Sequence, residues 1–321
     1  MAHYLDPKND LTFKRVFGEH KHLCKSLLNS MLPLEKPIVS LEYQTNELIP
    51  ETNVLRNSMV DVRCTDSEGR QFIVEMQMYW SEMFKSRVLL NASKAYVMQL
   101  NRAEEFRMLR PVYALNFVND VFEKSPEMRG EYYHHYKIVN IKHIEKQIEG
   151  LEFVFIELPK FGPQNRAEKM LHDLWLRFLT EINENTEEAP EELLENEYTR
   201  EAVKYMEAGA YSKEQLLTYD KWKIDVLTEQ GIVDDASTKG RAEGEAIGLE
   251  KGKVIGLAEG EAIGLKKGEA IGLEKGEAIG ETKKLKTVIT NGLRAGLPME
   301  TLSIVTGLAA EEIMKMIKEN K

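Results

Sequence analysis

Two acidic residues, Asp61 and Glu75, stand on either side of a short turn where a β-hairpin would bring them together. The segments 59–65 and 71–78 alternate apolar and polar residues, which is typical of β-strands, and 66–70 (DSEGR) is rich in turn formers. A hairpin that turns about the middle of 66–70 places the two acidic residues opposite each other, with Cβ atoms about 4.5–5.5 Å apart. Two carboxylates so placed repel each other unless a cation lies between them. Oxygen ligands of this kind suit Mg²⁺, Mn²⁺ or Ca²⁺ better than zinc.

The same pattern has a plainer interpretation. Acidic residues on the outer face of a hairpin are commonly just solvated, and one Asp and one Glu about a turn do not by themselves make a metal site. A slip of one residue in the register would also separate Asp61 from Glu75. Gln77 emerges on the same face as Glu75, two residues further on.

The elements that must position this hairpin alternate between helix and strand. Apolar residues at helical spacing predict a helix over 11–32, with Asp10 as its N-cap. A strand is expected over 37–48, and a helix over 82–105 follows the hairpin. The rest of this region is expected to add strands at 110–118, 132–140 and 151–158, and helices at 165–184, 190–208 and 212–230. This order predicts an α/β core with helices on a mixed sheet.

A repeat divides the chain. Glycine recurs at every fourth residue from Gly240 to Gly280, within an octad close to GEAIGLEK. The sequence therefore predicts a mixed α/β domain with a helical extension at 1–235, the repeat at 236–283, and a short helical tail at 284–321. On a helix the glycines form a slowly drifting stripe, which favours a long, marginal helix that self-associates into a homo-oligomer. A flexible charged spacer is the alternative.

Composition limits the class of protein. The chain has 321 residues, of which 42% are hydrophobic, enough for a sizeable core. Its two cysteines, no apolar run of membrane length and no secretory signal predict a cytoplasmic protein without a membrane partner. The net charge of −10 lies in the second part of the chain, because residues 1–120 hold equal numbers of acidic and basic residues. A basic or neutral groove for nucleic acid in the first part is therefore not excluded.

The motifs together resemble those of a known family. The spacing from Asp61 to Glu75-Met76-Gln77 resembles the metal-binding hairpin of the PD-(D/E)XK nuclease superfamily. More narrowly, the chain resembles the Rpn family of recombination-promoting nucleases and transposases. The opening DPKNDLTFKRVFG is similar to the first helix of that family, and GLPMETLSIVTGLAAEEI is similar to its helical tail. The helix after the hairpin, which carries Lys85 and Arg87, also resembles its counterpart. The likeness covers most of 6–120 and about 284–321.

This resemblance implies a fold and an activity. The fold would be the restriction-endonuclease-like α/β core, a mixed sheet flanked by helices, followed by a helical extension. The activity would be metal-dependent cleavage of DNA phosphodiester bonds, in the setting of DNA recombination or mobile elements. Asp61 and Glu75 would bind Mg²⁺ through their side chains and Met76 through its backbone carbonyl, with Mn²⁺ or Ca²⁺ as possible substitutes.

The chain departs from the superfamily pattern at Gln77, where lysine is common. A glutamine orients a water molecule but supplies no positive charge and takes no proton. We hypothesise that Lys14 or Lys85 supplies the missing charge. Arg87 is expected either to contact DNA phosphates or to lie on a solvated face, and Asp10 either to cap its helix or to reach the site.

A second class of function fits the same residues. A catalytically weak DNA-binding or scaffolding protein that keeps the nuclease fold is favoured by Gln77, the acidic net charge and the repeat. The paired carboxylates favour the enzyme.

The tail has two short helices joined at Thr306-Gly307-Leu308, a pattern that resembles a helix-turn-helix. Because its second helix is not clearly basic, packing or oligomerisation is favoured there over DNA contact.

Overall fold

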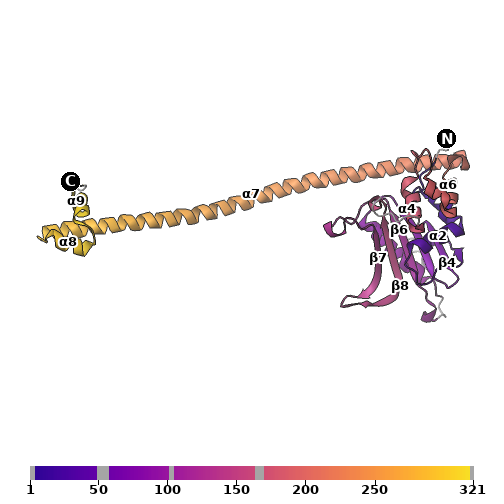
Figure 1. Cartoon of the computed structure of the whole chain (residues 1–321), viewed down its shortest axis with the longest axis horizontal. Coiled ribbons are helices and arrows are strands. Elements are labelled where there is room, and N and C mark those ends of the chain that lie inside the picture. The colour runs from indigo at the N-terminus through magenta and orange to yellow at the C-terminus, as the bar shows by residue number, and fades with distance from the viewer. Residues whose placement is uncertain (1–3, 49–57, 101–104, 163–169, 319–321) are drawn as a thin grey trace. The chain divides into compact units, whose positions relative to one another are not determined.

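The computed structural model describes residues 4–48, 58–100, 105–162 and 170–318 (Figure 1). The chain divides into two compact units, Met1–Val233 and Asp234–Lys321, and each is described by itself. Within the described residues, every helix is too short or too polar to cross a membrane.

The first unit is built on a six-stranded mixed sheet with the strand order β1-β4-β5-β6-β8-β7. The central strands β5, β6 and β8 run parallel, and the remaining pairs are antiparallel. The strands are β1 Leu41–Tyr43, β4 Val62–Asp66, β5 Gln71–Gln77, β6 Val112–Val118, β7 Tyr133–Asn140 and β8 His143–Glu157. A separate two-stranded sheet pairs β2, Glu47–Leu48, with β3, Ser58–Met59. The expected fold class, a mixed sheet flanked by helices with a helical extension, is confirmed.

Two strands differ from their expected lengths. The segment expected as one strand over 37–48 contains the short strands β1 and β2, which belong to different sheets. Strand β8 begins eight residues before the expected start at 151, because it pairs with β7 through a long hairpin. The register between them shifts between Lys137 and Ile138 and again between Val139 and Asn140. Such irregularities break the simple alternation on which the sequence-based boundary depended.

The N-terminal helical region is broken, where a continuous helix over 11–32 was expected. It consists of α1, Asp10–Phe13, a π-helical turn, Lys14–Gly18, and α2, Lys21–Met31. Asn9 is the N-cap, since its side chain accepts a hydrogen bond from the Leu11 N–H at 2.8 Å. The prediction that Asp10 caps the helix is wrong. Asp10 is already helical, and its carboxylate pairs with Lys14 instead, at 2.6 Å.

One face of the sheet is covered by these helices and by a group from the middle of the chain. The group comprises α4, Leu171–Glu181, α5, Glu191–Glu195, and α6, Glu197–Tyr205. Phe17 lies at the centre of the contact, with its ring 4.9 Å from Phe13, 5.3 Å from Trp175 and 6.4 Å from Phe178 between centroids. These rings and the apolar residues of β4 and β5 form one buried cluster.

The opposite face is covered by α3, Glu82–Val97, which Ser81 caps through a hydrogen bond from the Phe84 N–H. This helix ends at Val97, eight residues before the expected 105. Phe84, Val88 and Ala92 pack against Ile73 and other residues of β5, β6 and β8. The sheet is therefore buried on both sides. This burial explains why β6 reads as a continuous apolar run rather than an alternating one.

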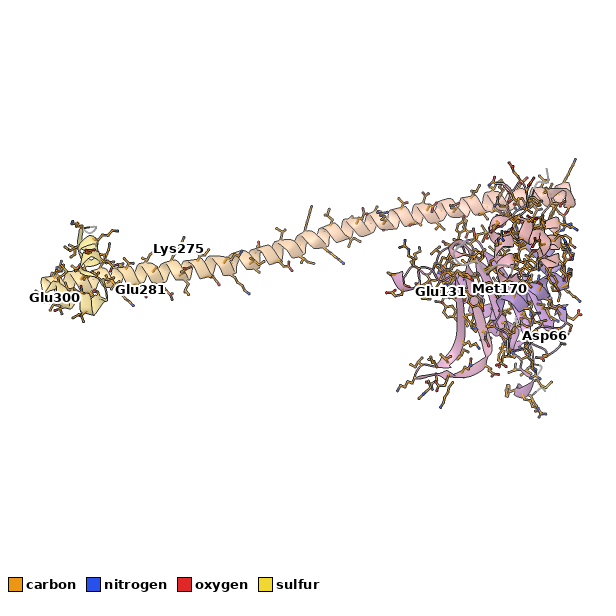
Figure 2. The ribbon with its side chains drawn as sticks, in the orientation of Figure 1. Asp66, Glu131, Met170, Lys275, Glu281 and Glu300 are labelled. Atoms are coloured by element: carbon orange, nitrogen blue, oxygen red, sulfur yellow. The ribbon has the colours of Figure 1, made fainter. Side chains whose placement is uncertain are left out.

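The second unit is helical. The division between the units falls within α7, Lys213–Arg294, so the expected helix over 212–230 continues through the whole glycine repeat. The repeat's side chains are exposed, and Lys275 and Glu281 project away from the helix (Figure 2). Two short helices, α8 Met299–Thr306 and α9 Ala310–Lys318, pack against the end of α7 through a small core of Ile289, Leu302 and Ile313.

Replacing Phe17 with alanine should strongly destabilise the first unit. The ring is fully buried among three other aromatic rings, and truncating such a side chain costs about 3–5 kcal/mol. Urea unfolding of the full chain measures the change. Phe106→Ala is the matched control, because the ring of Phe106 is 85% exposed. A Phe17→Ala variant as stable as Phe106→Ala would contradict this account of the core.

Candidate active site

The hairpin of β4 and β5 has the register that the sequence predicts. Val62 pairs with Val74 and Thr65 with Gln71, so the turn is centred within 66–70. Asp61 directly precedes β4, and the same register extended by one residue places it opposite Glu75. The two carboxylates thus come from neighbouring strands at one point of the sheet.

Asp61 is fixed by a hydrogen bond to the partner strand. Its Oδ2 accepts the backbone N–H of Met76 at 2.8 Å, and its Oδ1 lies 3.9 Å from Nζ of Lys14. Asn46 holds the backbone beside it, donating to the carbonyl of Asp61 at 2.9 Å and accepting the N–H of Arg63 at 3.2 Å. The Asp61 side chain is 23% exposed, so a ligand can reach one side of it.

Glu75 is more deeply placed, at 4% exposed, because α3 covers it. Two residues one turn apart on that helix contact its two oxygens. Asn91 donates from Nδ2 to Oε1 at 3.0 Å, and Arg87 donates from Nη2 to Oε2 at 3.4 Å. The simple alternative of a solvated hairpin face therefore does not hold for Glu75.

Burial raises the pKa of both carboxyl groups. For Asp61 the pKa rises to about 7, mainly through desolvation and further through the negative charges of Glu75 and Asp10. The Met76 N–H and Lys14 oppose this rise. The pKa of Glu75 is also raised by desolvation, against the opposing effects of Asn91 and Arg87. A site with these properties favours a proton, or a cation that takes the proton's place.

Gln77 does not point freely into the site. Its Oε1 accepts a hydrogen bond from Nη2 of Arg87 at 2.9 Å, and its Nε2 donates to the carbonyl of Tyr79 at 3.1 Å. The same guanidinium nitrogen therefore lies between Gln77 and Glu75. Arg87 is also 5.0 Å above the ring of Phe84, which steadies its orientation.

Of the basic residues considered from the sequence, the structure brings Lys14 and Arg87 to the carboxylates and leaves Lys85 apart. Lys14, at the start of the π-helical turn, joins Asp10 to Asp61. Lys85 lies two residues before Arg87, a rotation of about 200° on an α-helix. It therefore faces a different surface, where it lines an aromatic pocket.

The sequence interpretation missed two asparagines that hold the carboxylates, and a third that lies next to Glu75 in the sheet. Asn46 and Asn91 hold Asp61 and Glu75 as described above. Asn116 of β6 stands beside Glu75 in the sheet register and is fully buried in the apolar cluster under α3. The Oδ1 atoms of Asn91 and Asn116 are buried without a hydrogen-bond partner. An asparagine within the apolar run RPVYALNFV was the available signal for the third.

No group of three or more His, Cys, Asp or Glu side chains suited to a metal ion occurs among the residues that the structure describes. The expected ligand set contains only two such side chains, together with a backbone carbonyl. The residues present fit that smaller set, because the pKa values of both carboxyl groups stay raised although Lys14 and Arg87 lie beside them.

Comparison with known proteins connects this geometry to a family. A family model described as PD-(D/E)XK nuclease family transposase matches residues 7–234. The matched segment contains the whole sheet, the helices on both of its faces, and Asp61 and Glu75. No curated protein and no solved structure matches the chain.

Asp61→Asn should change how the stability of the metal-free chain depends on pH. Because the pKa of Asp61 is raised in the folded state, its stabilising contribution is fully present below about pH 4 and is lost as pH rises through about 7. Asparagine keeps the acceptor for the Met76 N–H but does not titrate. From pH 4.5 to 7.5 the variant should therefore gain about 1–3 kcal/mol relative to wild type in urea unfolding with EDTA.

The control for this measurement is Asp220→Asn, which alters an exposed aspartate on α7. Its stability relative to wild type should not change with pH. If Asp61→Asn behaves like this control, the carboxyl group is not held in the way described.

Proposed function

The chain belongs to the PD-(D/E)XK nuclease family transposases, and on that premise we propose that it is a metal-dependent endonuclease that hydrolyses DNA phosphodiester bonds. The observation that carries the proposal is the pair of carboxylates, Asp61 and Glu75, on neighbouring strands, with the N–H of Met76 donating to Asp61. Recombination or the movement of mobile elements is the proposed setting.

Asp61 and Glu75, with the backbone carbonyl of Met76, would hold one divalent ion, Mg²⁺ foremost. When bound, such an ion lowers the pKa of a water molecule and stabilises charge on a phosphate oxygen. The protein's own part is to orient the ligands. The Met76 N–H and Lys14 fix the Asp61 carboxylate, and Asn91 fixes that of Glu75. Because both pKa values are raised, binding of the ion would release protons and strengthen as pH rises.

Arg87 supplies, in this proposal, the positive charge that Gln77 lacks. Its guanidinium contacts Glu75 and Gln77 together, at the place where the superfamily commonly has a lysine ammonium. A guanidinium stays protonated at neutral pH, so it can stabilise a phosphate but cannot accept a proton. Both amide atoms of Gln77 are engaged, one by Arg87 and one by the backbone. The role of Gln77 is therefore to position Arg87 rather than a water molecule.

The repeat favours association of copies. Leucines and isoleucines of α7 recur at eight-residue spacing with exposed side chains, including Leu249, Leu257, Leu265 and Leu273. A solitary helix with a glycine at every fourth position loses about 1 kcal/mol per glycine relative to alanine. Burial of these exposed apolar side chains against a second copy would offset part of that loss, so we propose a homo-oligomer through this segment.

The test is cleavage of supercoiled plasmid by the full chain with Mg²⁺, Mn²⁺, Ca²⁺ or EDTA. Nicking or linearisation should require a divalent ion. Asp61→Asn and Glu75→Gln should each lower the rate by at least about 100-fold, because each removes a charge from the ligand set while keeping its shape. Asp220→Asn, the exposed control, should cleave like wild type.

Two outcomes would overturn the proposal. Cleavage that survives both substitutions would mean that the activity lies elsewhere or in a contaminant. Intact DNA binding with no cleavage under any of the metals would favour the scaffolding protein that keeps the nuclease fold, which Gln77 and the acidic net charge also favour.

Arg87→Ala should reduce cleavage on the order of 100-fold, as expected for loss of one donor that stabilises the transition state. Arg87→Lys should recover part of the rate, since it restores charge but not the planar geometry that spans Glu75 and Gln77. Arg107→Ala is the matched control, because Arg107 is exposed and pairs with Glu105 away from the site. Equal rates for Arg87→Ala and the control would remove Arg87 from the mechanism.

A further inference from the structure

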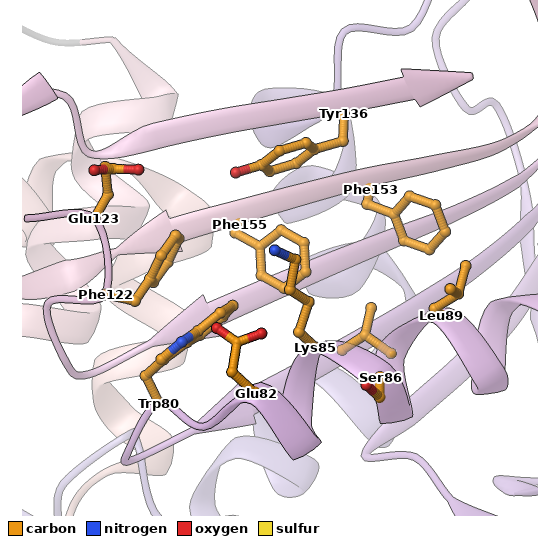
Figure 3. A pocket seen from close by; sticks show the side chains of 11 residues that line it. Trp80, Glu82, Lys85, Ser86, Leu89, Phe122, Glu123, Tyr136, Phe153 and Phe155 are labelled. Carbon is orange, nitrogen blue, oxygen red and sulfur yellow. The ribbon is translucent and has the colours of Figure 1, made fainter. Parts of the chain in front are cut away.

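A pocket of about 530 Å³ opens between α3 and the strands β7 and β8 (Figure 3). Five aromatic residues line it, together with Lys85, Ser86 and Leu89 of α3 and the carboxylates of Glu82 and Glu123. The aromatic residues are Trp80, Phe122, Tyr136, Phe153 and Phe155. Tyr136 is 44% exposed and points into this pocket.

The aromatic walls provide flat surfaces. Trp80 and Phe122 stack on each other with centroids 4.0 Å apart and planes inclined by 21°. Phe155 forms the floor, and Tyr136 meets it edge-on at 5.8 Å. Trp80 and Phe122 cover each other's facing surfaces, so a ligand would meet their outer faces and the ring of Tyr136. An uncovered aromatic face stacks with any nucleobase, whatever the DNA sequence.

Polar groups without partners converge on the same space. Among the residues that the structure describes, the indole N–H of Trp80, the hydroxyl of Tyr136 and the ammonium of Lys85 form no hydrogen bond or ion pair. Lys85 extends over the pocket toward Phe155, and Glu82 also lines the pocket (Figure 3). A few polar groups that converge in an aromatic cavity are the usual mark of a site for a specific ligand.

The wall formed by Phe122 is fixed in advance. The backbone N–H groups of Phe122 and Glu123 both donate to Oε1 of Glu157, at 2.6 and 3.0 Å. Glu157 is fully buried, and its other oxygen is held by His134 at 2.9 Å and by Lys160 at 2.5 Å. The protein's own contacts therefore hold this wall of the pocket in place.

We propose that this pocket binds an unpaired nucleobase of the DNA strand that the active site cleaves. A base offers a flat heteroaromatic ring for Trp80, Phe122 and Tyr136, and an edge of donors and acceptors for Glu82, Trp80 and Tyr136. The ammonium of Lys85 is placed at the rim for the phosphate attached to that base. The two glutamates disfavour a phosphate inside the pocket, so the base enters and the backbone stays outside.

The pocket and the candidate active site lie on two faces of the same helix, α3. Trp80 follows the last residue of β5, Gln77, by three residues, and its backbone N–H donates to Asp120 at 3.0 Å. Helix α3 carries Arg87 toward Glu75 and Lys85 toward the pocket. A strand that crosses the beginning of α3 would thus meet both sites. The inference rests on the proposed nuclease function, because that function supplies the DNA.

The experiment measures binding of two labelled single-stranded oligonucleotides by fluorescence anisotropy. One carries ordinary bases, and the other has the same phosphates with abasic sites. The full chain carries Asp61→Asn so that the proposed active site does not cut. The ordinary oligonucleotide should bind at least about five-fold more tightly, since stacking of one base contributes that much or more.

Variants locate the effect in the pocket. Tyr136→Ala should remove most of the preference for the ordinary oligonucleotide, and Tyr136→Phe should keep most of it because the ring remains. Lys85 is exposed on the surface of α3, so the Lys85→Ala variant should fold normally. This variant should bind both oligonucleotides more weakly, and its binding should depend less on salt concentration. Phe106→Ala removes an exposed aromatic ring outside the pocket. It should change neither the preference for the ordinary oligonucleotide nor the salt dependence of binding.

Equal binding of the two oligonucleotides by the parent chain would overturn the base pocket, even if plasmid cleavage stands. A preference that persists unchanged in Tyr136→Ala would also overturn it, by placing the base elsewhere. A preference that is lost in Tyr136→Ala would support the pocket, even if plasmid cleavage fails and the nuclease proposal falls.

Discussion

The first unit depends on one electrostatic constraint, the confinement of Asp61 and Glu75 between a sheet and the helices on its two faces. The hairpin register brings the carboxylates together, and α3 removes Glu75 from water. Asp10, Asp61 and Glu75 are opposed by Lys14 and Arg87, which leaves an excess of negative charge when all are ionised. Such an arrangement favours protonation or a bound cation. The same constraint therefore explains the raised pKa values and the proposed metal.

The supporting residues follow from this constraint. A buried carboxylate is stable only when its oxygens are hydrogen-bonded, and Asn91, the Met76 N–H and Arg87 meet that need. Because these hydrogen bonds are directional, they restrict how the carboxylate groups rotate. The residues that stabilise the buried carboxylates therefore also orient them as the proposed metal ligands.

Local pattern predicted the hairpin but not its surroundings. Alternation with period two and a five-residue turn define the pairing of Val62 with Val74, and both are visible in the sequence. The choice between Lys85 and Arg87 was not visible. Both lie on one helix two residues apart, and only the packing of α3 on the sheet decides which faces Glu75. Asn46 acts on the backbone of Asp61 through a contact between distant segments, for which the sequence carries no local pattern.

Helix α3 lies between the carboxylate site and the aromatic pocket and contributes residues to both. The face with Arg87 and Asn91 meets carboxylates whose charge is hard to sustain, whereas the face with Lys85 and Leu89 meets aromatic rings with unsatisfied polar groups nearby. Phe84 and Val88 between these faces anchor the helix in the apolar cluster. Movement of α3 would therefore alter both environments at once. Ser81 at its start and this apolar cluster fix α3 in place. Because the helix is fixed, a DNA backbone held at the carboxylate site would place a neighbouring base at the aromatic pocket.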